Sequence, residues 1–213
     1  MKKLLLASII SGLASVAAAD SFQDFNNNLY AQYQYTGTNG SSGYETSQYG
    51  IGGTFQSKNN VWLNANATSG DNSGLSSSNL GFAVGYAFQF FGDENQGFQV
   101  IPHANFSTQS GTQAGTYNSG TQYVYGLGIK PEYRLLNSLK VAVDLNLAGT
   151  QTSNQTGQST QIFAFSVTPG VQYDISKTVM LGLDYNYAAP FNDNANTYPN
   201  GLSTVTAKVG YLF

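Results

Sequence analysis

The chain has 213 residues, with 8 Lys and Arg against 11 Asp and Glu, and a formal net charge of −3. This balance excludes the basic footprint that nucleic-acid binding needs, so we expect no nucleic-acid partner. The sequence contains no cysteine and only 9% charged residues. An exported form would therefore depend on packing and hydrogen bonds, without a disulfide framework.

The first nineteen residues have the form of a secretory signal peptide. Lys2 and Lys3 make a positive start, an apolar run follows at 4–16, and 17–19 are three alanines suited to cleavage. A transmembrane anchor is the alternative, but the apolar run is short and no stop-transfer charges follow it. We predict a signal peptide at 1–19 and a single mature domain at 20–213, with six basic and eleven acidic residues and a balance of −5.

After a polar leading segment (20–28), apolar and polar residues alternate along most of the chain. A period of two places the apolar residues on one face of a β-strand and the polar or small ones on the other. The alternating segments, in chain order, are 29–35, 44–55, 61–67, 80–90, 98–106, 123–134, 139–147, 163–173, 179–187 and 205–213. Long polar connections are expected at 37–43, 69–78, 107–120, 149–159 and 192–201, and short turns at 57–59, 92–95, 137–138 and 174–177.

The last segment indicates how these strands are arranged. Val205, Ala207, Val209, Tyr211 and Phe213 share one face, and the sequence stops on the aromatic residue. An unpaired apolar edge strand recruits other chains, whereas a closed barrel has no free edge. We predict an all-β fold, a closed antiparallel transmembrane β-barrel of about ten strands, with eight as the alternative.

The positions of the charges support a barrel that is apolar outside. In the confidently assigned strands every charge lies on the polar face, at Lys130, Glu132, Arg134, Lys140, Asp144, Asp184 and Lys208. An Arg or Lys that faces lipid at the midplane costs about 2–4 kcal/mol. A soluble β-sandwich, the alternative fold, would instead place its charges on the watery outer face and its aromatics inside.

With its leader, its alternating strands, its long and short connections and its terminal Tyr211-Leu212-Phe213, the chain resembles small Gram-negative outer-membrane β-barrels of the porin-like or opacity type. It is also similar in style to the OmpA and OmpX barrels. The resemblance implies location in the bacterial outer membrane, contact with its lipid, short periplasmic turns and long extracellular loops. It further implies that the barrel-assembly machinery reads Val209, Tyr211 and Phe213.

The inward face contains the candidate site residues. We predict that the lumen is lined by His103, Asn105, Lys130, Glu132, Arg134, Lys140, Asp144, Asp184 and Lys208. Two interpretations stay open. The charges either pair and plug the interior, because buried charges must be paired, or they line a narrow polar passage. Many inward positions are Gly or Ala, and ten strands enclose more space than eight.

Catalysis is not expected. His103 is the only histidine, and the residue two positions on is Asn105, where outer-membrane lipases and deacylases carry a serine nucleophile. A single histidine without cysteine is also a poor basis for a metal site, and we expect neither metal nor cofactor. The function predicted is structural or that of a narrow porin-like channel for small solutes. The alternative is an adhesin or interaction protein that binds a surface ligand through its extracellular loops.

Overall fold

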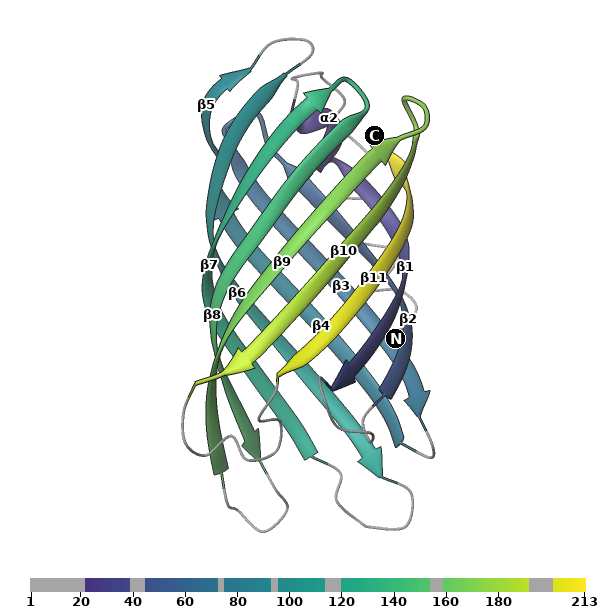
Figure 1. Cartoon of the computed structure of the whole chain (residues 1–213), viewed down its shortest axis with the longest axis vertical. Coiled ribbons are helices and arrows are strands. Elements are labelled where there is room, and N and C mark those ends of the chain that lie inside the picture. The colour runs from purple at the N-terminus through teal and green to yellow at the C-terminus, as the bar shows by residue number, and fades with distance from the viewer. Residues whose placement is uncertain are drawn as a thin grey trace.

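The computed structural model describes residues 22–38, 45–72, 75–92, 96–113, 120–153, 159–191 and 201–213. The predicted signal peptide and the tips of the predicted long loops lie outside these residues. The described chain forms a closed antiparallel barrel (Figure 1). Its strands are β1 (Asn28–Thr38), β2 (Glu45–Gln56), β3 (Val61–Asn72), β4 (Leu75–Tyr86), β5 (Phe88–Gly92), β6 (Gly97–Gln113), β7 (Gly120–Leu136), β8 (Leu139–Ser153), β9 (Ser159–Asp174), β10 (Val179–Pro190) and β11 (Leu202–Leu212).

The barrel closes between the first and the last strand. β1 and β11 pair along their whole length, from Asn28 opposite Leu212 to Thr38 opposite Leu202. Elsewhere strands pair with their neighbours in sequence, except that β4 and β5 do not pair with each other and both pair with β6. β5 continues β4, so the wall has ten spans. The predicted closed ten-strand antiparallel barrel is therefore confirmed.

The fourth span differs from the continuous strand predicted at 80–90. It is interrupted at Ala87, which is fully buried and whose backbone N–H donates to the Asn60 carbonyl at 2.8 Å. Beyond this point β5 pairs with β6 among the described strands, with a register shift between Gln89 and Phe91. The sequence alternation continues through the break, because Phe88 and Phe90 both face outward. Alternation by itself therefore did not reveal the interruption.

Several strands run further than their apolar residues indicated. The predicted loop at 69–78 is mostly strand, since β3 ends at Asn72 and β4 begins at Leu75. The predicted loop at 107–120 likewise begins as strand, because β6 continues to Gln113. These extensions are built from polar residues, and Ser78 and Ser110 are hydrogen-bonded across them at 2.7 Å. A β-ladder needs backbone partners and no apolar side chain, so the apolar pattern marks only the lipid-facing part of each strand.

The two ends of the barrel differ. The end that carries the connections 57–60, 137–138 and 175–178 is called the turn end here, and the opposite end the loop end. The turn end holds the terminal Phe213 and a one-turn helix, α2 (Gln23–Asn26), which lies inside the mouth of the barrel (Figure 1). The sequence had indicated only a polar leading segment at this point.

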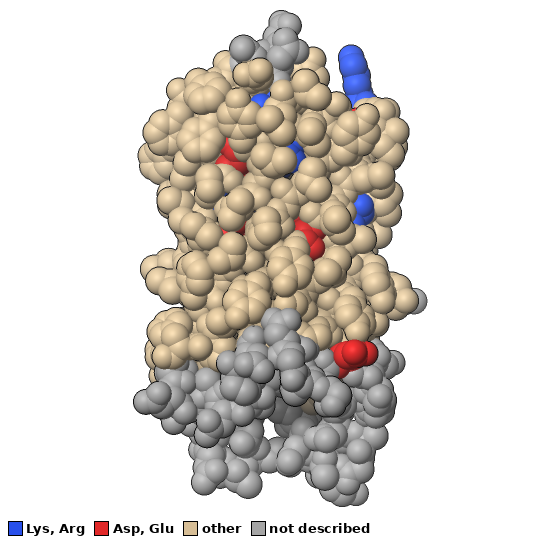
Figure 2. All heavy atoms as spheres, viewed as in Figure 1, with Lys and Arg blue, Asp and Glu red and all other residues tan. Residues whose placement is uncertain are grey.

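The outer surface is apolar at mid-height. Leu127, Leu147, Leu183 and Val209 are each more than half exposed, and Figure 2 shows a surface in which Lys, Arg, Asp and Glu are sparse. Among outward strand residues whose side chains the structure describes, the charged one is Glu45, the first residue of β2 at the loop end. Aromatic residues flank the apolar band at both ends, at Phe88, Phe90, Phe98, Tyr133, Tyr173 and Tyr211 on the turn side and at Tyr35, Phe106, Tyr123, Phe163 and Tyr187 on the loop side. Such a surface fits a bilayer with interfacial aromatic girdles.

Over the described residues, no helix has both the length and the apolar character needed to span a membrane.

The outward orientation of this band can be tested at β10. We predict that Leu183→Lys lowers the free energy of unfolding from lipid vesicles by about 2–4 kcal/mol, because it places a charge in hydrocarbon. The control is Asn186→Lys on the same strand, which faces the lumen and loses one hydrogen bond, to Thr168, worth about 1 kcal/mol. Denaturant titration of both variants measures the difference, and equal losses would contradict a lipid-facing Leu183.

Candidate functional site

The lumen contains an elongated cavity with a volume of about 910 Å³. This is within the range of about 300–1,000 Å³ that is typical of small-molecule sites. At the turn end its floor includes Asn26 and Lys140, and it extends along the strands to Thr36, Ser76 and Gln122 near the loop end. Between these limits its walls are mainly Asn, Gln, Ser and Thr side chains, which alternate along each strand with the lipid-facing residues.

Residues 22–28 close the turn end of this cavity, and we call them the plug. Phe22, Phe25 and Asn26 are 2%, 1% and 0% exposed, so the segment lies inside the mouth of the barrel. One side chain of the wall and one of the plug itself bond its backbone. Gln172 donates to the Phe25 carbonyl at 3.1 Å, and Asn28 donates to the same oxygen at 2.7 Å. The plug therefore fills the lumen at this end by specific contacts with the strands.

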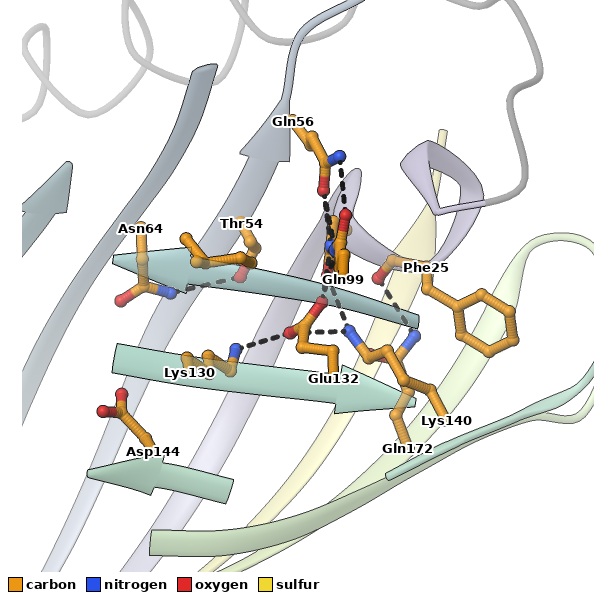
Figure 3. Close-up of polar contacts among 12 residues, drawn as sticks. Phe25, Thr54, Gln56, Asn64, Gln99, Lys130, Glu132, Lys140, Asp144 and Gln172 are labelled. Carbon is orange, nitrogen blue, oxygen red and sulfur yellow. Dashed lines mark hydrogen bonds and ion pairs between the residues drawn. The ribbon is translucent and has the colours of Figure 1, made fainter. Parts of the chain in front are cut away.

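Glu132 on β7 is the centre of the contacts between plug and wall, and it is fully buried. One carboxylate oxygen lies 2.9 Å from Lys130 Nζ and 3.5 Å from Lys140 Nζ. The other accepts hydrogen bonds from Asn26 at 2.9 Å and from Gln99 at 2.7 Å. Figure 3 shows both lysines and Gln99 converging on this carboxylate. Two cations and two amide donors thus compensate a charge that would be costly to bury alone.

Asn26 is the part of the plug that enters this network. Its amide nitrogen also donates to Gln56 at 2.7 Å, and its amide oxygen accepts from Lys140 Nζ at 2.6 Å. The two phenylalanines of the plug lie beside cations of the wall. Arg134 lies 5.8 Å from the centre of the Phe22 ring and Lys140 lies 5.9 Å from that of Phe25, within the range of cation–π contacts.

His103 belongs to a second group, deeper in the lumen. Its Nε2 lies 3.5 Å from an Asp144 oxygen, its Nδ1 lies 3.2 Å from the Ile101 carbonyl, and its ring centre is 5.6 Å from that of Trp62. The imidazole occupies space left by Gly128, where an added Cβ would meet His103 Cε1 at 2.6 Å. Asn105, two residues along, lies against Gly126 in the same manner. These contacts hold the imidazole in place, and the strand offers a carboxamide next to it in place of a hydroxyl nucleophile.

Lys208 and Asp184 form an ion pair across β11 and β10, and both border the cavity. Lys208 Nζ also lies 5.0 Å from the centre of the Tyr30 ring, which is buried below it. Gly170 provides space for the carboxylate, since a Cβ there would overlap Asp184 Oδ1. The pair is therefore fixed from several sides.

The nine residues predicted from sequence to line the lumen occupy two kinds of place. Those that border the cavity are Lys130, Lys140, Asp144, Asp184 and Lys208. Glu132 and Arg134 contact the plug, and Arg134 also donates to the Gln96 carbonyl at 3.1 Å. His103 and Asn105 lie deeper, against Gly128 and Gly126. The sequence did not indicate the plug residue Asn26 or three amides of the network. Gln56 bonds Asn26, Gln99 bonds Glu132, and Gln172 bonds the Phe25 carbonyl. The available signal was Phe22 and Phe25, spaced as on one face of a helix and followed by three asparagines.

Across the described ranges, no three residues of the types His, Cys, Asp or Glu come together in a way that would hold a metal ion.

No protein-family model matches this sequence, and no curated protein matches it. Solved structures do match. The NanC porin superposes with a TM-score of 0.51 at 11% identity, over 87% of this chain and 100% of that one. The KdgM porin in complex with disordered oligogalacturonate gives a TM-score of 0.45 at 11% identity, over 86% and 99% of the two chains. Ail, the attachment invasion locus protein of Yersinia pestis, gives 0.44 at 13% identity, over 87% and 95%.

The fold is that of an outer-membrane β-barrel. At such low identity the NanC likeness establishes architecture, and the surface of this chain gives the location. A closed barrel with an apolar band, aromatic girdles and a polar interior is the architecture of transmembrane β-barrels in bacterial outer membranes. The chain is thus an integral protein of the bacterial outer membrane. The turn end, with its short connections, is the periplasmic end of such a barrel.

The dependence of the plug on Glu132 can be tested directly. We predict that Glu132→Ala releases the plug, because Lys130 and Lys140 lose their shared counter-charge and Asn26 loses an acceptor. Chymotrypsin should then cleave after Phe25, which is buried in the parent, while heat-modifiable gel mobility reports that the barrel is still folded. The control is Asp184→Ala, which breaks an ion pair that does not touch the plug. Equal protection of Phe25 in both variants would contradict the role given to Glu132.

Proposed function

We propose that this protein is a narrow, porin-like conduit for small polar solutes across the outer membrane. The observation that carries the proposal is the continuous polar cavity, which runs from the plug to the loop-end part of the strands. A barrel that served only as a scaffold has no need of such a cavity, since a small barrel fills its interior with side chains. Here glycines and short polar residues on the inward face leave that space.

The plug is the barrier that a solute meets at the turn end. It consists of residues 22–28 and one helical turn, which is too short to be stable alone. Its hold on the wall is through hydrogen bonds of Asn26, the Phe25 carbonyl and Asn27, together with two cation–π contacts. Polar contacts of this kind exchange with water at modest net cost. We therefore propose that displacement of the plug opens the conduit.

Permeation requires no catalysis, and we propose that the protein has none. His103 is engaged by Asp144, Trp62 and the Ile101 carbonyl, and Asn105 stands where a nucleophile would be needed. The alternative of a surface adhesin rests on the loop tips, which lie outside the described residues. It stays a prediction, to be tested by deleting single loops and measuring binding to cell surfaces with the barrel intact.

The conduit can be tested by conductance in planar bilayers. We predict that the refolded mature protein shows small or rare openings, and that deletion of 20–26 gives a larger and steadier conductance because the floor of the cavity is lost. The deletion keeps Asn27, whose carbonyl and side chain bond Phe213 and Gln56 at the seam. A folded deletion variant without conductance would overturn the conduit and leave a sealed scaffold.

Assembly provides a second test. We propose that the barrel-assembly machinery reads the terminal strand at Val209, Tyr211 and Phe213; the first two side chains are more than half exposed on the outer face. Phe213→Ala should reduce the amount of folded protein in the outer membrane several-fold, while refolding of the purified variant in detergent stays unchanged. Tyr185→Ala, an outward aromatic on β10, is the control. Equal reductions for both variants would contradict a specific terminal signal.

A further inference from the structure

One wall of the cavity is formed by β1 to β4, β6 and β7. We infer that this wall binds uncharged, polyhydroxylated solutes of the saccharide or polyol class. The inference rests on the proposed function, because it names the solutes that the conduit would admit.

Strand register arranges hydrogen-bonding side chains in a row around this wall. Gln32 on β1 is level with Gly50, Gly50 with Thr68, Thr68 with Asn79, Asn79 with Gln109, and Gln109 with Gln122. All of them have inward parity, and Gln32, Asn79, Gln109 and Gln122 border the cavity. Neighbouring strands lie about 4.8 Å apart, so the row presents an amide or hydroxyl at nearly every step.

Away from the plug and its contacts at Glu132, four polar atoms of this wall have no hydrogen-bond partner among the described residues. Two are donors, Gln32 Nε2 and Trp62 Nε1, on side chains that are 5% and 3% exposed. Two are acceptors, Asn66 Oδ1 and Asn79 Oδ1. Buried polar groups cost free energy unless they are paired, so these side chains favour a ligand or water that bonds them once they turn toward the cavity. A hydroxyl both donates and accepts, and a solute with several hydroxyls matches donors and acceptors that lie on the same wall.

Around the cavity three lysines lie near three carboxylates, which is why the ligand is assigned as neutral. Lys130 and Lys140 share Glu132, Lys208 is paired with Asp184, and Asp144 faces His103. An ionic solute would have to break one of these contacts to gain a partner, and breaking a buried pair leaves an uncompensated charge. A neutral solute leaves all of them in place.

Water is the competing occupant, because it satisfies the same atoms. A solute with several hydroxyls replaces several separate waters and is immobilised once, so it gains where each water is held individually. The difference is measurable, because Trp62 is the single tryptophan of the chain and borders the cavity. Its fluorescence reports directly on this wall.

The experiment titrates the refolded mature protein in detergent micelles with maltotriose and follows Trp62 emission. We expect a saturable change, and at least tenfold weaker binding for the variant that carries Gln32→Leu and Asn79→Leu. Gln89→Leu, at an exposed position of β5 outside the lumen, is the control and should bind as the parent does. Each single lumen substitution should weaken binding partially, which keeps the test informative if the double variant fails to show heat-modifiable mobility.

Trigalacturonate, an anionic trisaccharide, distinguishes the charge classes. Weaker binding of trigalacturonate than of maltotriose supports the inference, and equal or tighter binding overturns it. Absence of any saturable change in Trp62 emission also overturns it, and water is then the occupant that bonds the wall. Binding in micelles needs no conduction, so a barrel that binds maltotriose without conducting refutes the conduit alone. One that conducts without binding refutes this inference alone.

Discussion

Hydrocarbon offers no hydrogen bonds to a peptide group, so a sheet that crosses a membrane must pair every backbone donor and acceptor with another strand. The seam between β1 and β11 meets this requirement by pairing the two strands from Asn28 to Thr38. The rest of the structure depends on that closure. It fixes the register of every neighbouring strand, and with it the inward or outward direction of each side chain along the wall.

Closure turns the usual distribution of residues inside out. Leucine, valine and aromatic side chains face lipid, and the interior receives amides, hydroxyls and the few charges. Large inward side chains then need space, which glycines on adjacent strands provide. Gly52 accommodates the Tyr30 ring and Gly128 accommodates His103. The small volume of these inward glycines also leaves the cavity that the proposed conduit would use.

The interior divides into a compact turn end and an open middle. Around Glu132, two lysines and two amides surround one carboxylate, and the plug supplies one of those amides through Asn26. Further toward the loop end, the lining is mainly Asn, Gln, Ser and Thr apart from the Asp184–Lys208 pair, and several of its polar atoms are unpaired among the described residues. Closure of the barrel by its own leading segment and recognition in its middle would thus be carried out by different residues, which separate variants can affect independently.

The sequence by itself determined the barrel, its ten spans and the facing of residues such as Leu183 and Asp184, because a period of two survives in any strand that separates lipid from a polar interior. It did not reveal the break at Ala87, where the alternation continues unchanged, or the strand beyond Ser69, where polar residues pair through their backbone. It also could not show that Asn26 meets Glu132, 106 positions away. That contact and the row of amides from Gln32 to Gln122 arise only when the fold brings distant strands to one level. The sharing of Glu132 by Lys130 and Lys140 is more local, because these residues lie on the paired strands β7 and β8. Side-chain direction is local information, whereas partners across a lumen depend on the register of the whole barrel.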